Sequence, residues 1–297
     1  MDDNPRSETP VYEAAGGDAP HASAPNPPPS GAAYMRGERH PVAGSIPRST
    51  SRYLNSPLFV HAFAQRSLRR YGDDVNTTYD TPDMTRGIAD VVDLEEAQGA
   101  IDLEKARNPA FRSWLERRHI SHYSAQALAH HPAGTLGHAI RSFMTSSGLN
   151  INFLNEGAPP KTDVEYIRRR AGGAHDIQHI VTGFGPDPAG EQALGMMNVT
   201  CNAQGFNPVL ARFISMPITF ISSAGFTRAC LNYPAGLPTI LDAMELGIRA
   251  GKAIRTPLVL VDWEPYLDWR LDDIAADLGF ERGPGKAWEA TNETCLG

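Results

Sequence analysis

Apolar residues recur at spacings of three and four along almost the whole chain after residue 50. This spacing places them on one face of an α-helix, and the alternation typical of β-strands is nearly absent. Residues 258–261 form the one short run that reads as a strand, but four residues cannot be told from the start of a buried helix. We therefore expect a mostly α-helical protein, with helices near residues 56–71, 85–98, 108–118, 122–130, 133–147, 161–182, 191–204, 207–223, 236–253 and 269–278.

The folded part is expected to be one compact, multi-helix domain over residues 49–285. The chain has 297 residues, of which 41% are hydrophobic, and this is enough to form a core. Residues 1–48 carry nine of the 24 prolines among Gly, Ala and Ser. Such a segment cannot bury enough apolar surface to offset its chain entropy. We predict that residues 1–48 are disordered and that residues 286–297 form a flexible C-terminal tail.

Charge and cysteine content narrow the range of partners. The formal net charge is -7 at pH 7, which argues against nucleic acid because neutralising phosphates requires a basic face. The three cysteines lack CxxC spacing, so they indicate neither a disulfide framework nor a thiolate metal site. The run of three arginines at residues 168–170 is the exception to the acidic balance. It fits either a solvated helix face or attraction to an anionic headgroup or lipid surface.

The sequence carries no pattern typical of a secretory signal, a mitochondrial presequence or a transmembrane span. No apolar segment follows Met1, and acidic residues near it disfavour a mitochondrial presequence. The most apolar stretch, residues 206–226, is interrupted by Pro208, Arg212 and Pro217, and an Arg inside a bilayer costs roughly 2.5–3.5 kcal/mol. We expect no transmembrane span, and a bacterial cytoplasmic location with peripheral contact at the inner membrane.

The run His-Asp-Ile-Gln-His at residues 175–179, followed after eleven residues by Glu191, most constrains the chemistry. On a helix, His175 and His179 lie on one face about a turn apart, so both rings can reach one ion. The glycines and prolines that follow are expected to end this helix and turn the chain back. Glu191 would then open the next helix and face the first. An isolated His pair at this spacing also occurs on solvated helices.

Asp176 separates this run from the zinc-protease motif, which has Glu directly after the first His. The shorter carboxylate does not favour peptide-bond hydrolysis. Asp176 fits either an additional ligand or a partner that fixes a ring tautomer, and we favour the ligand. We expect one divalent metal, Zn, Fe or Mn, because mixed imidazole and carboxylate ligands suit all three. The metal and catalytic residues would be His175, Asp176, His179 and Glu191.

Residues 206–226 also have two interpretations. In the first, they form a helix in the centre of the core. In the second, they line an apolar cavity that binds a lipid tail beside the metal. Each CH₂ group of such a tail gains about 0.8 kcal/mol on burial. The candidate lining residues are Phe206, Leu210, Phe213, Ile214, Ile218 and Ile221, with Met216 and Phe220 beside them.

The HDxxH pattern, eleven residues and then Glu resembles the motif of the ubiquinone (coenzyme Q) biosynthesis family called COQ four. Similar segments at residues 132–148 and 245–280 extend the resemblance over roughly residues 50–280. The chain departs from the family at residues 170–174, where family members usually have Arg-Tyr-Arg-Glu before the HD pair. It also has Gly195 and Asn198 where they tend to have Lys and Glu.

The resemblance implies a metal-dependent step on a polyprenylated hydroxybenzoate, in which the ring C1 carboxylate is lost and replaced by a hydroxyl. It also implies a polyprenylated aromatic lipid and other quinone-biosynthesis enzymes as partners. Two alternatives stay open: a non-catalytic lipid-binding organiser of those enzymes, and a paralogue that acts on another prenylated or aromatic metabolite. A homodimer is compatible with the sequence.

Overall fold

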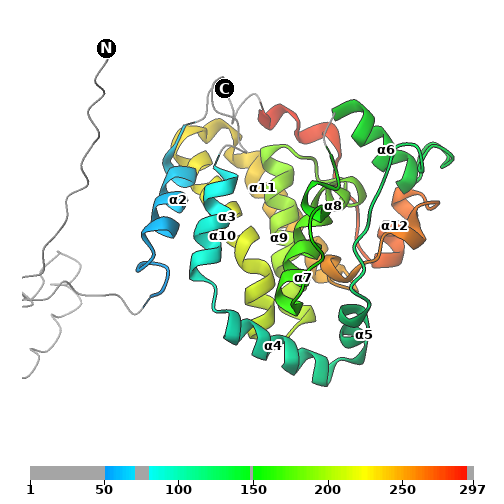
Figure 1. Ribbon diagram of the computed structural model, residues 1–297. Helices are drawn as coiled ribbons and strands as arrows, with labels where there is room; N and C mark the ends of the chain where they lie inside the picture. The colour runs from blue at the N-terminus through cyan, green and yellow to red at the C-terminus, as the bar shows by residue number, and fades with distance from the viewer. Residues whose placement is uncertain (1–50, 71–79, 148–149, 293–297) are drawn as a thin grey trace, which may run out of the picture. The chain divides into compact units, whose positions relative to one another are not determined.

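The computed structural model describes residues 51–70, 80–147 and 150–292, which are helices joined by turns and loops (Figure 1). Within these ranges there is no β-strand, only two isolated bridges that pair Thr135 with Arg270 and Phe184 with Gly285. The expectation of a mostly α-helical fold is confirmed. The described residues all belong to one compact unit, Ser49–Gly297. The predicted disorder of residues 1–48 concerns residues outside the described part.

The helices are joined both by short turns and by longer connections, such as those between α5 and α6 and between α11 and α12. The α-helices are α2 (Pro57–Leu68), α3 (Thr81–Val91), α4 (Leu94–Arg107), α5 (Pro109–Arg117), α6 (Leu136–Ser147), α7 (Asp163–Gly173), α8 (His175–Thr182), α9 (Pro188–Gly205), α10 (Pro208–Asn232), α11 (Leu237–Ala253) and α12 (Leu271–Leu278). The short 3₁₀ helices are η1 (Phe153–Asn155), η2 (Pro234–Gly236), η3 (Leu258–Leu260), η4 (Glu264–Tyr266) and η5 (Lys286–Trp288).

Two predicted helices divide in the structure, and a side-chain cap explains the first division. Asp93 is extended, and its side chain accepts a hydrogen bond of 3.0 Å from the backbone N–H of Glu96. It therefore starts α4, and the predicted helix over residues 85–98 becomes two. The predicted helix over residues 161–182 divides at Ala174 into α7 and α8. The two histidines consequently begin a short helix of their own.

One further expectation was wrong, and one open alternative is decided by the structure. Residues 122–130 form no helix: residues 125–130 are turns, and before them the backbone N–H and C=O of Tyr123 are both bonded to the side chain of Asn152, at 2.9 and 2.7 Å. These bonds take the backbone groups that a helix would need. Residues 258–261, which the pattern left open between a strand and the start of a buried helix, contain the helix η3, in which Leu258 is fully buried.

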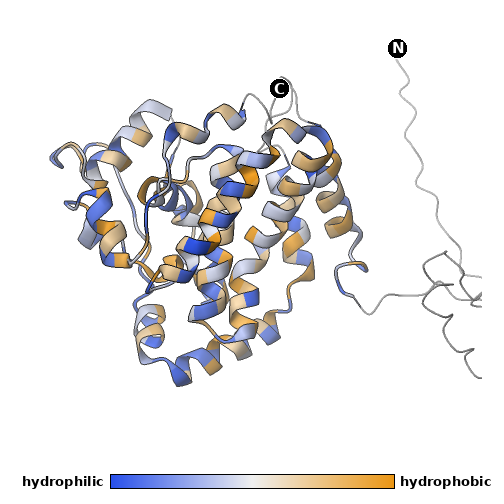
Figure 2. Cartoon of the chain, turned by 180° about the vertical axis from the view of Figure 1, so that it is seen from behind, coloured by the Kyte–Doolittle hydropathy of each residue, from blue (hydrophilic) through white to orange (hydrophobic). Residues whose placement is uncertain are grey.

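The core is built around α9, which lies against both α10 and α11 (Figure 1). Gly247 and Gly251 of α11 face the backbone of Ala193 and Met197, and a Cβ at either glycine would collide with α9. The missing side chains let the two helices approach closely. Figure 2 shows hydrophobic and hydrophilic residues sharing nearly every helix, as helices with one buried face require. This packing fixes the position of Glu191, which α9 carries.

Among the described residues, α10 is the one helix long and apolar enough to cross a membrane by length and composition. Its most apolar window has a mean hydropathy of 1.4, and 44% of that window is buried inside the protein. One such helix is weak evidence for a span, because a core helix has the same properties. The absence of a transmembrane span and the cytoplasmic location stay predictions.

Candidate metal centre

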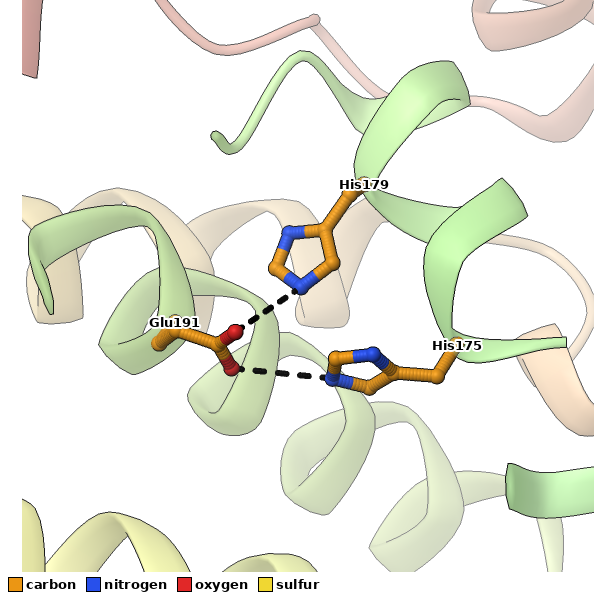
Figure 3. A group of neighbouring side chains, drawn as sticks. All are labelled: His175, His179 and Glu191. Atoms are coloured by element: carbon orange, nitrogen blue, oxygen red, sulfur yellow. Dashed lines mark ion pairs between the residues drawn. The ribbon is translucent and has the colours of Figure 1, made fainter. Parts of the chain in front are cut away.

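Three of the predicted site residues converge between two helices (Figure 3). His175 and His179 project from α8 toward Glu191 on α9. The Nε2 atom of His179 lies 3.3 Å from Oε1 of Glu191, and the Nε2 atom of His175 lies 3.6 Å from Oε2. One potential ligand atom from each residue falls within 4.8 Å of the other two. This arrangement can hold a single cation between two imidazoles and a carboxylate.

The turn between α8 and α9 brings the carboxylate back to the histidines. Gly183 ends α8 in the left-handed conformation, with φ of 68°, which favours glycine. Asp187 caps α9 by accepting a hydrogen bond of 2.9 Å from the backbone N–H of Gly190. A Cβ at Gly190 would collide with the carbonyl oxygen of Gly185, so the turn closes tightly at this point. Glu191 follows directly in the first turn of α9.

The tautomer of His179 is set by the backbone. Its Nδ1 lies 2.7 Å from the carbonyl oxygen of Phe184, which can only accept, so Nδ1 carries the proton and donates. In the neutral ring, Nε2 is then an acceptor that faces the carboxylate of Glu191. Nε2 is buried and has no hydrogen-bond partner within the described ranges. Two facing acceptors repel unless a cation, either a proton or a metal ion, lies between them.

Asp176 does not join these three ligand atoms. Its Oδ1 lies 3.3 Å from Nδ1 of His175, whereas the other ring nitrogen of His175 faces Glu191. Asp176 therefore contacts the outer side of the ring. This is the place of a carboxylate that fixes the tautomer and orientation of a metal-binding histidine.

The electrostatics of the site favour positive charge. Burial by itself would lower the pKa of His175, but hydrogen bonds and charge from Asp176 and Glu191 outweigh it and raise that pKa to about 10. Burial opposes ionisation of Glu191, yet the charge of His179 and the hydrogen bond from His175 hold its pKa well below the usual range. A site with this preference can exchange protons for a divalent cation.

A C-terminal segment, residues 283–291, holds the turn between α8 and α9. The backbone N–H of Gly283 donates to the carbonyl oxygen of Thr182 at 2.7 Å, and that of Gly285 donates to Gly183 at 3.0 Å. The sequence pattern gave no indication of these contacts, and a flexible tail over residues 286–297 stays a prediction. Within residues 286–292, Thr291 is buried and Trp288 partly buried while the others are exposed, and residues 293–297 lie outside the described part.

The same segment contacts the elements that aim both ligand helices. The ring of Trp288 stacks on Phe184, with centroids 6.0 Å apart and an interplanar angle of 21°. The hydroxyl of Thr291 donates to Oδ1 of Asp187 at 3.1 Å. Phe184 orients His179, and Asp187 caps the helix of Glu191, so the C-terminal segment supports both. Trp288, a large aromatic residue in an otherwise polar stretch, was the feature of the sequence that could have indicated this contact.

The candidate lipid-lining residues divide into two groups. Phe206, Leu210, Phe213 and Ile214 are buried in a cluster with residues of α4, α5 and α7. The hollow beside Phe213 measures about 20 Å³, room for a water molecule but not for a prenyl chain. Ile218 and Ile221 are only partly buried. The packing of the first group is that of a core helix, the alternative that the sequence left open.

Gly195 and Asn198 place neutral groups along α9 beyond Glu191. A Cβ at Gly195 would collide with the hydroxyl of Ser222, so α9 and α10 meet closely there. The amide of Asn198 donates to Oε1 of Gln178 at 2.9 Å. Gln178 precedes His179 on α8, and the pair therefore links the two ligand helices by a neutral hydrogen bond.

Comparison with known proteins identifies two similarities. The sequence model of a family described as Coenzyme Q (ubiquinone) biosynthesis protein Coq4 matches residues 108–284. A crystal structure of a proposed ubiquinone biosynthesis protein from Nostoc punctiforme PCC 73102 has a TM-score of 0.57 and 20% sequence identity. The match covers 77% of this chain and 96% of that chain, and at this identity it shows the fold alone. No curated protein matches the chain.

Proposed function

The chain belongs to the coenzyme Q (ubiquinone) biosynthesis family Coq4, which implies involvement in ubiquinone biosynthesis, and on that basis we propose that it is a metal-dependent enzyme. Its substrate in this proposal is a polyprenylated hydroxybenzoate, whose C1 carboxylate is lost and replaced by a hydroxyl. One observation carries the metal: potential ligand atoms of His175, His179 and Glu191 all lie within 4.8 Å of one another between two helices.

The site is accessible enough for a substrate. The side chains of His175 and Glu191 are 33% and 40% exposed, whereas that of His179 is 7% exposed. Three protein ligands leave a coordination position open, which is typical of catalytic metal sites, whereas structural sites are closed by four. This openness supports an enzyme over the alternative of a non-catalytic organiser. Partner enzymes and a homodimer stay predictions.

The residues of the site would have distinct tasks. A bound metal would supply a Lewis acid that holds the substrate carboxylate or an adjacent phenol oxygen and stabilises charge as CO₂ departs. His179 keeps its acceptor atom aimed at the site through the bond to Phe184. We assign Asp176 to orienting His175 through Nδ1, in place of the direct ligation that the sequence favoured. Replacing a carboxylate by a hydroxyl is a two-electron oxidation, so the reaction needs an external oxidant.

A related substrate is the second candidate. The neutral pair of Asn198 and Gln178 joins the two ligand helices at a place where the resemblance leads one to expect charged residues. The site would then accept a substrate whose aromatic headgroup lacks the charge that a Lys–Glu pair would recognise. In this alternative the protein keeps the metal and acts on another prenylated aromatic metabolite.

The test combines metal analysis with turnover. Purified full-length protein should contain about one divalent metal per chain, and His179→Ala or Glu191→Gln should lose it. His122→Ala, which changes an exposed histidine outside the site, is the matched control. Turnover of a prenylated hydroxybenzoate in air should yield CO₂ and the hydroxylated ring. Metal retained in both site variants would refute the site, and metal without turnover would favour the related substrate, which mass spectrometry of co-purified lipid can identify.

A further inference from the structure

Apolar and basic side chains meet on the surface formed by η1, the loop after it and α7. Phe153 and Leu154 of η1 are 71% and 53% exposed, which is unusual for side chains of this size. Leu154 also lies over Gly172 of α7, where a Cβ would be 3.1 Å from its Cδ1 atom. The apolar pair is therefore held by contact with α7, next to the arginines of that helix.

A groove of about 550 Å³ opens beside Leu154. Its apolar wall includes Pro159 and Pro160, and its basic wall is formed by Lys161, Arg168 and Arg169. Glu165 is the one carboxylate among the residues that line it. The groove thus has a formal excess of positive charge on a chain whose net charge is -7.

The acidic groups near this groove are already engaged. Glu165 accepts hydrogen bonds from the backbone N–H groups of Lys161, at 2.6 Å, and Thr162, at 3.3 Å. Asp163, at the start of the same helix, pairs with Arg118 and with Lys105. Asp163 is therefore paired with other cations, and the Glu165 carboxylate, which keeps its charge, is held at the start of α7 by backbone N–H groups.

Neither Arg168 nor Arg169 forms an ion pair with the described residues, although the charge of Arg169 acts on Glu165 from a longer distance. Among the residues that the structure describes, none brings a carboxylate within 4.0 Å of either Arg168 or Arg169. Arg168 is half-buried, and burial lowers the pKa of its guanidinium. A cation that loses solvent without gaining a partner is unfavourable unless an anion from outside supplies the contact. Arg170, the third arginine of the run 168–170, differs from the other two because it is buried and forms an ion pair of 3.1 Å with Asp262.

From this arrangement we propose that η1 and the arginine groove of α7 form a docking surface for an anionic lipid bilayer. Phe153 and Leu154 enter the interfacial region, where apolar side chains leave water. Arg168 and Arg169 bind lipid phosphate oxygens, because guanidinium groups match phosphate geometry. The predicted peripheral membrane contact would thus be made by η1 and α7. Binding of this surface to a bilayer does not require a metal in the site.

The surface is connected to the metal centre through the chain. α7 carries the arginines and continues through Ala174 into α8, which begins at His175. Docking by α7 would therefore orient the adjoining metal helix relative to the bilayer that contains a prenylated substrate. The acidic remainder of the protein would favour this one face, since like charge repels the other faces from an anionic membrane.

The experiment is vesicle co-sedimentation with the full-length protein. We expect binding to vesicles of equal parts phosphatidylcholine and phosphatidylglycerol, weakened by salt, and little binding to phosphatidylcholine alone. The Arg168→Gln/Arg169→Gln variant should bind about 30-fold more weakly, which corresponds to roughly 1 kcal/mol for each arginine near the membrane. Arg249→Gln/Lys252→Gln is the matched control, because it removes two exposed charges from α11.

Further variants separate docking from simple phosphate binding. Phe153→Ser/Leu154→Ser should weaken binding about tenfold, while the control Leu241→Ser, at an exposed leucine on α11, should not. Equal loss in the arginine variant and its charge control would overturn the proposal. So would full vesicle binding by the Phe153 and Leu154 variant together with displacement by inorganic phosphate, which would indicate a phosphate site alone. Arg169→Gln by itself serves if the double variant unfolds, and metal content measured on each sample keeps this result separate from the proposed activity.

Discussion

The Nδ1 atom of His179 donates a hydrogen bond of 2.7 Å to the carbonyl oxygen of Phe184, five residues later in the chain. Phe184 is fully buried and stacked against Trp288, so the acceptor is held in place by the C-terminal segment. The bond selects the tautomer in which Nε2 can bind a cation. A residue outside the motif thereby determines which atom of the motif faces Glu191.

Asp176→Asn should reduce metal affinity by roughly 10- to 100-fold without abolishing binding, because Asp176 contacts the outer nitrogen of His175. Competition with a chelator of known affinity measures the change. His179→Ala is the reference variant, because it shows how much affinity is lost when a metal ligand is removed. A loss as large as that of His179→Ala would show that Asp176 binds the metal directly. Wild-type affinity without turnover would instead indicate proton transfer.

Gly190→Ala should displace the first turn of α9, because the new Cβ would collide with the carbonyl oxygen of Gly185. We expect the free energy of unfolding to fall by about 1–3 kcal/mol and metal content to drop with it. Gly99→Ala is the control: no atom lies within 4 Å of its Cβ position in α4, and the change should stabilise by about 0.5–1 kcal/mol. Unchanged metal binding in Gly190→Ala would mean that the turn does not position Glu191.

Thr291→Val keeps the shape of the side chain and removes a hydroxyl whose proton is shared between Oδ1 of Asp187, at 3.1 Å, and the carbonyl oxygen of Trp288, at 2.7 Å. Both residues are buried, so the loss should cost about 1–3 kcal/mol in the free energy of unfolding, measured by urea denaturation. Metal affinity should weaken as well, because Asp187 caps the helix of Glu191. Lys286→Gln, which alters an exposed side chain of the same segment, should leave both quantities unchanged. Identical stability of Thr291→Val and wild type would contradict a supporting role for the segment.

Phe213→Ala tests whether α10 is a core helix or a lipid-binding wall. Phe213 is buried among residues of α4, α5 and α7, so we expect the free energy of unfolding to fall by about 3–5 kcal/mol. Ile218→Ala, at a partly buried position on the same helix, should cost less. If Phe213→Ala retains stability but loses co-purified lipid, Phe213 lines a cavity. If Ile218→Ala alone loses lipid, the tail lies near Ile218.

Local patterns were sufficient for much of the helical structure and for three atoms of the site. Two histidines four residues apart must share a helical face, and Gly183 and Asp187 are residues that end one helix and begin the next. These relations span only a few residues, so the chain encodes them before it folds. The sequence could therefore predict that Glu191 faces the histidines, because the turn between the two helices is encoded by neighbouring residues.

Tertiary packing decided what neighbouring residues cannot specify. Whether Asp176 faces the ion or the outer ring nitrogen depends on how α8 is rotated against α9. Burial of Trp288 against Phe184 depends on a contact between residues 104 positions apart, and periodicity carries no information about such pairs. The burial of Phe213 likewise depends on α4, α5 and α7 covering it. An apolar residue encodes that it will leave water, but the surface that covers it is chosen by the whole fold.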